Sequence, residues 1–354
     1  MVVLFADGFD TGADPGAYVG RSKVEGSFIS VDNVTGGRNG GRRMRVRTAR
    51  QAANERGLHC PIDAGTDDLW WGCYTMNPDE QNSVQVRWVV FYAGPDAADA
   101  VIAFIRDNNG NFEVHVSPDM TATPLVTADF SFSIPSGVNR HLSGHIVRTE
   151  DGGYVECFAD GVLVGTTDDI PELATLDDYA DPVPFTKVLW SARSTQTGSN
   201  NNNGFLDDCW VATENLGDAF ILLVPPDSDG TYTDGTLEPA SPDAAWELVS
   251  DVPPDYDRYV GLAGGDKRSF GYDVSNLEAV SAGAIAAIIV EPAIEGVSSV
   301  DVFARFAGTD HALGTGEVGE TEVRHAPVQS LANPGTLALW TVADLAAAEF
   351  GFEA

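Results

Sequence analysis

The chain has 354 residues, 43% of them hydrophobic, and its 53 acidic and 20 basic residues give a net charge of −33. This length suffices for two domains that each bury a core, and the apolar content excludes a disordered chain. The charge excludes nucleic acid and anionic membranes as partners that are attracted through bulk electrostatics.

The N-terminal residues, MVVLFADGFD, lack the basic segment with which a signal peptide begins. The most apolar run, AIAAIIV at residues 284–290, is too short to cross a bilayer. We therefore expect synthesis in the cytoplasm and no membrane anchor. Only three residues are lysines, and an Asp-rich, Lys-poor surface suits salty water, where self-repulsion is screened; a high-GC genome with ordinary acidic bias is the alternative explanation.

An arginine-rich segment at residues 38–56 interrupts this acidic chain with seven arginines. Arg43, Arg45 and Arg47 alternate along it, so a strand here would place all three on one face. One interpretation is a solvated face that balances neighbouring acids. The other is a docking stripe for an acidic surface, on another copy of this protein or on another partner, because guanidinium groups bind carboxylates well.

Aromatic and amide residues suggest a glycan site. Trp70, Trp71 and Tyr74 cluster in DDLWWGCYTMN; adjacent residues of a strand face opposite ways, so we expect one tryptophan in the core and the other exposed. An exposed aromatic ring beside polar groups is a common support for a sugar. The loop TGSNNNNG, with Asn201 and Asn202, would line its rim or form an exposed loop tip.

Alternating apolar residues and regularly spaced turns predict an all-β chain. Alternation is clear at residues 85–89 and 114–116, and turn signals recur every eight to twelve residues. Asp160-Gly161 lies between VECFA and VLVG, a dipeptide typical of a tight hairpin because both positions tolerate positive φ. A short helix is expected at residues 342–350, with Thr341 as its N-cap.

We predict two β-sandwich (jelly-roll) domains. The first spans residues 1–214 and the second residues 215–354, which include the short C-terminal helix. The Pro- and Asp-rich stretch PPDSDGTYTDGTLEPASPD is interpreted as a long loop early in the second domain, since regular strand patterns resume after it.

Other candidate chemistry is weak. Asp207 and Asp208 are adjacent, so on a strand they would point to opposite faces, one tying a loop and the other facing solvent or a cation. His141 and His145 would share a face but have no evident third metal ligand. Calcium is a possible ligand of the acidic loops, although no twelve-residue calcium loop is present, and no cofactor is expected. Cys157 and Cys209 are expected to be buried thiols; Cys60 and Cys73 are either thiols or a disulfide.

Three segments carry a resemblance: LFADGFDTG, GHIVRTEDGGYVECFADGVLVGTT and GFLDDCWVA. They resemble the concanavalin A-like (laminin-G-like) sandwich modules of tailed-virus structural proteins, in which an acidic first strand, a D-G hairpin and a closing strand with two acids recur. Residues from LGDAFILLVPP to the C-terminus resemble the companion domain of such proteins. The resemblance implies a concanavalin A-like first domain and membership of a virion.

We therefore predict a non-enzymatic virion protein of a tailed virus, an exterior tail, baseplate or fibre component. Its partners would be copies of itself, other virion proteins and host surface glycan. One alternative is a capsid decoration or head-fibre protein without a ligand. The other is a polysaccharide depolymerase on the same fold, which the absence of an E-x-D-x-x-E strand argues against.

Overall fold

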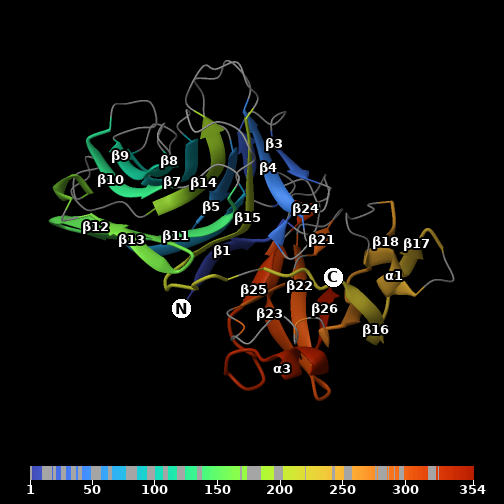
Figure 1. Cartoon of the computed structure of the whole chain (residues 1–354). Helices are drawn as coiled ribbons and strands as arrows, with labels where there is room; N and C mark the ends of the chain where they lie inside the picture. Colours follow the sequence, from blue (N-terminus) through green and yellow to red (C-terminus); the bar gives the residue numbers. More distant parts are fainter. Residues whose placement is uncertain are drawn as a thin grey trace. The chain divides into compact units, whose positions relative to one another are not determined.

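The computed structural model shows an almost entirely β protein, which confirms the predicted fold class (Figure 1). The chain divides into two compact units, one extending along the chain to Ile221 and the other formed mainly by Leu222–Ala354. The structure describes residues 2–9, 18, 21–24, 29–32, 37–38, 42–48, 57–62, 66–76, 86–93, 100–106, 111–117, 124–133, 138–167, 170–173, 185–194, 202–219, 221–240, 244–250, 257–275, 277, 285, 287–290, 292–294, 299–317, 324–325 and 327–354.

The first unit is a jelly-roll sandwich of two antiparallel sheets. In the eight-stranded sheet the order is β13-β12-β11-β6-β15-β4-β3, and β1 pairs with β15. Its strands are β1 (Val3–Asp7), β3 (Ile29–Asp32), β4 (Arg43–Thr48), β6 (Asp68–Met76), β11 (Arg140–Thr149), β12 (Gly152–Ala159), β13 (Val162–Thr166) and β15 (Asn202–Ala212).

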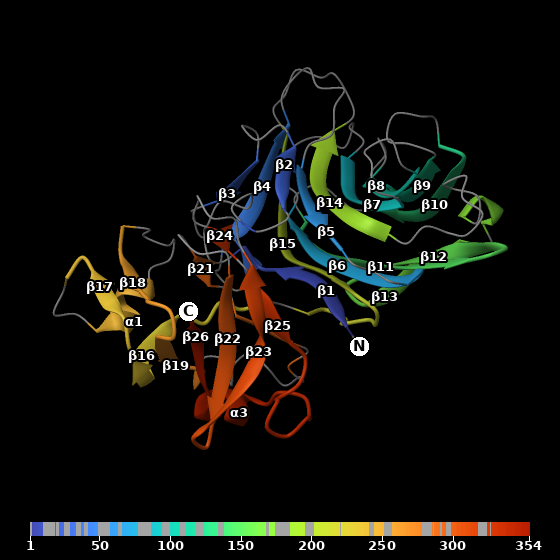
Figure 2. The ribbon, with the colours of Figure 1, turned by 180° about the vertical axis from the view of Figure 1, so that it is seen from behind.

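The seven-stranded sheet has the order β10-β9-β8-β7-β14-β5-β2. Figure 2 shows it from behind, above the eight-stranded sheet of the same unit. Its strands are β2 (Ser22–Val24), β5 (Gly57–Pro61), β7 (Val86–Ala93), β8 (Ala100–Arg106), β9 (Asn111–Ser117), β10 (Val126–Ser133) and β14 (Phe185–Ser194). A 3₁₀ turn, η4 (Pro171–Leu173), lies between β13 and β14 in the chain.

The core between the two sheets is rich in aromatic residues. Trp71, Trp88 and Trp190 are almost fully buried there, together with Phe91 and Phe104. Strand alternation explains the placement of Phe91, because its neighbours Val90 and Tyr92 belong to a separate buried group on the other face of the sheet.

Local sequence signals set the hairpins as predicted. Asp160 and Gly161 both have positive φ, 49° and 78°, and join β12 to β13. Glycine adopts this conformation without steric cost and aspartate tolerates it better than other residues do, which explains why this dipeptide closes the hairpin.

The second unit contains a five-stranded sheet of order β16-β19-β26-β22-β23 and three two-stranded sheets. Val302, Trp340 and Phe350 are central members of its core. Its elements are β16 (Pro226–Thr233), β17 (Thr236–Glu238), α1 (Ala245–Val249), β18 (Tyr259–Gly261), β19 (Lys267–Tyr272), β20 (Ile288–Val290), β21 (Ala293–Ile294), β22 (Ser299–Phe306), β23 (Thr309–Glu317), β24 (Arg324–His325), β25 (Val328–Ser330), α3 (Val342–Ala347) and β26 (Glu349–Glu353). The predicted long loop at residues 225–243 is wrong, because β16 and β17 lie within that stretch.

The predicted C-terminal helix is present as α3. Thr341 is its N-cap, and the Thr341 hydroxyl accepts from the Asp344 backbone N–H while Asp344 accepts from the Thr341 backbone N–H. This reciprocal pair is a capping box, which satisfies two donors at the start of the helix. In the described part of the chain, no helix has the length and apolar character needed to span a membrane.

Candidate functional site

A compact group of polar side chains lies on the face of the seven-stranded sheet that points away from the core. Tyr92 of β7 is directly opposite Lys187 of β14, and Leu189 of β14 is opposite His59 of β5. The His59 and Tyr92 rings meet edge to face with centroids 5.5 Å apart. The Lys187 ammonium lies 4.5 Å from the centroid of the Tyr92 ring.

These three residues, the His59–Tyr92–Lys187 cluster, stand beside an apolar floor. Val90, Ala103 and Leu189 form with Tyr92 a buried group that is separate from the sandwich core. Tyr92 itself is fully buried, whereas His59 and Lys187 are each partly exposed. Nε2 of His59 is buried, so a reactant that approached this face would meet the Lys187 ammonium and the other side of the imidazole ring, with the tyrosine behind them.

The cluster offers two complementary chemical groups. Histidine is the side chain best suited to exchange a proton near neutral pH, and a lysine ammonium binds a carboxylate as a point charge. The tyrosine ring limits where both can lie, through an edge contact and a cation–π contact. A second histidine on this face, His115 of β9, bonds instead to Glu113 at 3.0 Å.

No pattern in the sequence reveals this cluster. Its members lie on three strands far apart in the sequence, and only sheet pairing brings them together. Tyr92 was hidden because β7 (VRWVVFYA) is apolar on both faces, so that alternation does not mark an outward residue.

The predicted glycan residues do not form one surface. Trp71 is fully buried in the core, while Trp70 is partly buried on the opposite face and stacks on His145. Tyr74 lies on the outer face too, and the Arg38 guanidinium covers it at 4.9 Å from the ring centroid. Asn201 lies outside the described residues, and of Asn202 only the backbone, in β15, is described. Their predicted role in binding glycan stays a prediction.

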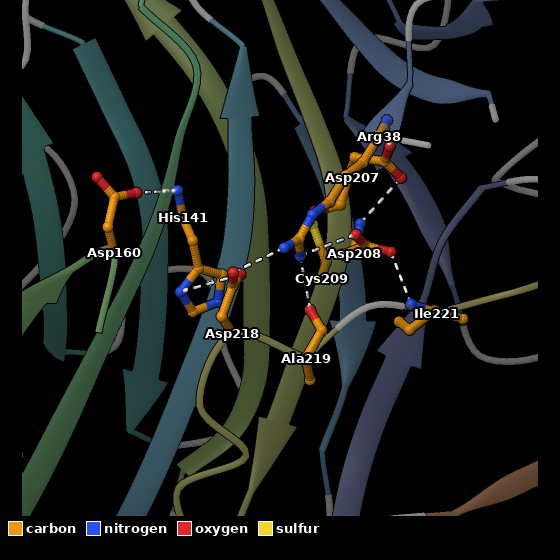
Figure 3. Close-up of polar contacts among 9 residues, drawn as sticks. All are labelled: Arg38, His141, Asp160, Asp207, Asp208, Cys209, Asp218, Ala219 and Ile221. Carbon is orange, nitrogen blue, oxygen red and sulfur yellow. Dashed lines mark hydrogen bonds and ion pairs between the residues drawn. The ribbon is translucent and has the colours of Figure 1, made fainter. Parts of the chain in front are cut away.

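Asp207 and Asp208 are both buried, and both bind backbone N–H groups (Figure 3). The Asp207 carboxylate accepts two hydrogen bonds, one from the backbone N–H of Arg38 at 2.7 Å and one from the backbone N–H of Asp208 at 2.9 Å. Asp208 accepts from the backbone N–H of Ile221 at 2.7 Å and has a positive φ of 47°. The expectation that one of them faces solvent or a cation is wrong: a bulge in β15 breaks the regular alternation, and Arg38 and Ile221 cover both acids.

Arg38 joins these acids to the segment that follows β15, as Figure 3 shows. Its guanidinium donates to Asp218 at 2.7 Å and to the Ala219 carbonyl at 3.1 Å. His141 lies beside Asp218 with 3.8 Å between the Nδ1 and carboxylate atoms. Burial lowers the pKa of His141, and Arg38 adds to the effect, while Asp218 and Asp160 oppose it. These contacts hold the chain in place, and they occupy the carboxylates of Asp207 and Asp208 with backbone N–H groups.

Of the predicted docking stripe, Arg43 and Arg45 alternate with the buried Met44 and Val46, so they lie on the face away from the core. Arg43 stacks on the ring of Phe205 at 3.7 Å. The side chain of Arg47 is outside the described part. Docking to a copy of this chain or to another virion protein stays a prediction.

All four cysteines are buried free thiols, which excludes the Cys60–Cys73 disulfide that the sequence left open. Burial raises the pKa of Cys60 to about 12 and raises the pKa of Cys73 further. Among the described residues, no group of three or more His, Cys, Asp or Glu side chains could hold a metal ion. Calcium binding stays a prediction.

No family model and no curated protein matches this chain. Solved structures do. "Cellulose induced protein, Cip1" has a TM-score of 0.42 at 16% identity, covering 61% of this chain and 100% of that one. Alginate lyase Aly36B has a TM-score of 0.41 at 13% identity, and the match covers 58% of this chain and 95% of that one. Alginate lyase vAL-1 from Chlorella virus has a TM-score of 0.37 at 11% identity, and the match covers 52% of this chain and 93% of that one. At such identities the likeness shows a shared fold alone.

These comparisons correct the prediction that the chain is not an enzyme. The argument against a depolymerase depended on the paired carboxylates of glycoside hydrolases, whereas the similar jelly-roll structures include proteins described as alginate lyases. The absence of an E-x-D-x-x-E pattern from the sequence is therefore no argument against an enzyme. The resemblance to tailed-virus structural proteins and the virion location stay predictions.

Proposed function

We propose that the chain is a polysaccharide depolymerase that cleaves uronate-containing chains by β-elimination at the His59–Tyr92–Lys187 cluster. The observation that carries the proposal is the pairing of a partly exposed imidazole and a partly exposed ammonium on one sheet face, both against the ring of Tyr92. The support comes from these side chains; the solved lyases contribute the fold alone.

The proposed reaction needs one cation and one proton-transfer group. Lys187 binds the uronate carboxylate, which makes the adjacent C5–H more acidic by stabilising the negative charge that develops. His59 takes the C5 proton, the C5–H electron pair forms the C4=C5 double bond, and the bond from C4 to the glycosidic oxygen breaks. The imidazolium then returns the proton to the departing oxygen, so no carboxylate pair and no added water are required.

Tyr92 is a positioning residue in this mechanism. Its fully buried ring cannot meet substrate in this conformation, but it contacts both reacting groups. Holding an acid–base group and a cation in fixed relation reduces the entropy that would otherwise be lost when the substrate binds.

The test is depolymerisation of a panel of uronate polymers, such as alginate and polygalacturonate, at moderate salt to screen the repulsion from a chain of charge −33. β-Elimination gives an unsaturated product that absorbs ultraviolet light, and new reducing ends measure cleavage of any kind. We expect both signals from the wild-type protein.

Two substitutions should remove both the ultraviolet signal of the unsaturated product and the new reducing ends. H59N should lower kcat by about 10²–10⁴-fold, the usual contribution of a general base, and K187Q should raise KM for uronate polymers strongly. H115N is the matched control, because His115 lies on the same face but bonds to Glu113. Full activity in H59N and K187Q, or no cleavage of any polymer by the wild type, would refute the proposal; reducing ends without the unsaturated product would indicate a hydrolase instead.

A further inference from the structure

A second polar and aromatic cluster lies on the outer face of the eight-stranded sheet. Trp70 of β6 stacks on His145 of β11 with ring centroids 4.0 Å apart and an interplanar angle of 10°. Tyr154 of β12 meets the same imidazole edge-on at 5.7 Å. Phe158 lies four residues after Tyr154 on β12, and the centroid of its ring is 5.6 Å from that of Trp70. Tyr154 is exposed, so the cluster reaches the surface.

Two carboxylates hold the imidazole at both ends. His145 Nε2 lies 2.7 Å from Asp68 Oδ1, and Nδ1 lies 3.0 Å from Glu156 Oε2. The Asp68 and Glu156 side chains are 60% and 27% exposed, respectively. Each carboxylate places one oxygen against His145, and within the described residues the second oxygen of each makes no hydrogen bond or ion pair. The two remaining oxygens are therefore acceptors in fixed positions beside an exposed aromatic ring.

This arrangement exceeds what sheet stability requires. Pairing of β6, β11 and β12 is already complete through their backbones around His145. Burial raises the pKa of Tyr154, and the nearby Glu156 and Asp68 carboxylates raise it further, so the phenol keeps its proton as a donor. The surface thus offers one donor, two acceptors and an aromatic edge.

We propose that Asp68, Glu156 and Tyr154 form a second carbohydrate site, which binds a neutral sugar ring. Sugar hydroxyls donate to the two carboxylates in charge-assisted hydrogen bonds, and the ring packs against Tyr154. Trp70 and His145 serve as the rigid support, not as the binding surface. The carboxylates repel uronates, so this site selects against the polymers that the proposed reaction at the other sheet cleaves.

The site is independent of the proposed depolymerase activity, because it lies on another sheet and shares no residue with the His59–Tyr92–Lys187 cluster. Its function would be to hold the protein on a neutral glycan while other polymers are processed elsewhere. A H59N/K187Q variant should therefore bind neutral glycan as the wild type does, which separates failure of one proposal from failure of the other.

The test is native affinity electrophoresis of the full chain in gels that contain starch, hydroxyethyl cellulose, xylan, β-1,3-glucan or galactomannan. We expect retardation in at least one neutral polymer. The D68N/E156Q variant should bind about tenfold more weakly, since neutral amides replace charge-assisted acceptors. Y154A, a substitution at an exposed position, should also weaken binding and guards against a folding defect in the double variant.

The matched control is E150Q/D151N, which removes two charges from the exposed turn between β11 and β12. It should be retarded like the wild type. Equal retardation of D68N/E156Q and the wild type would overturn the proposal, as would the absence of retardation in every neutral gel. Binding to polylysine alone, lost in D68N/E156Q and at high salt, would overturn it in favour of a cationic partner.

Discussion

Replacing Trp71 by alanine tests the central packing of the first unit. Trp71 is fully buried, its ring lies 4.5 Å from that of Phe104, and its indole covers Gly144 so closely that a Cβ there would lie 2.4 Å from Nε1. The surrounding groups belong to two hydrogen-bonded sheets, which cannot collapse into the space left behind. We expect a loss of about 3–5 kcal/mol in the free energy of unfolding, a large part of the roughly 5–15 kcal/mol that stabilises a domain.

The matched control is W70A, one residue away on the opposite face. Trp70 is only partly buried, and its main contact is the stack on His145, so its loss should cost about 1 kcal/mol. Urea unfolding of the full chain, followed by near-ultraviolet circular dichroism, measures the free energy of unfolding of both variants. The midpoints of the first unit's transition are compared under the condition that the dependence on urea concentration (the m-value) is unchanged. Equal destabilisation by the two substitutions would refute the assignment of these two tryptophans to different faces.

Three further predictions concern solution conditions. Burial lowers the pKa of His141 from 6.5, so on acidification the unfolded chain takes up a proton that the folded ring does not. The stabilising contribution of the neutral ring is complete above about pH 6.5, and the free energy of unfolding should fall as the pH drops below that value. Urea unfolding at several pH values should show a weaker fall in H141Q than in the wild type. A charge of −33 should make the melting temperature rise from millimolar to molar NaCl, and a flat series would show that the acids are already compensated. The buried thiols, with the pKa of Cys60 raised to about 12, should resist alkylation until urea unfolds the protein, and rapid labelling of the native protein would contradict their burial.

Short-range signals predicted much of the fold. The Asp160-Gly161 hairpin and the Thr341 cap depend on residues within a few positions of one another, so local sequence determines them. The alternation of Trp70 and Trp71 likewise follows from the period of a strand. Each of these features is decided before distant parts of the chain meet.

Long-range pairing and irregular backbone limited the rest. Asp207 and Asp208 were assigned to opposite faces by regular alternation, but the bulge in β15 and the positive φ of Asp208 break that rule. The partners that bury these acids, Arg38 and the backbone of Ile221, are distant in the sequence or outside a strand. His59, Tyr92 and Lys187 lie on strands that are neighbours in the sheet but far apart in the sequence. Such a candidate site leaves no spacing pattern in the sequence.

The distribution of charge over the sandwich gives the two proposed sites their separate chemistry. In a chain with 53 acids and three lysines, an exposed sheet face is expected to be acidic, and the face around Asp68 and Glu156 follows that expectation. The other face also carries acids, Glu113 and Asp129, but Lys187 places one of the few lysines there, over a buried tyrosine ring. A cation in this acidic chain relieves part of the self-repulsion, and at the surface it also attracts anionic groups. Its local attraction for a carboxylate therefore supports the anionic substrate that we propose for this face, while the acidic face suits neutral sugars.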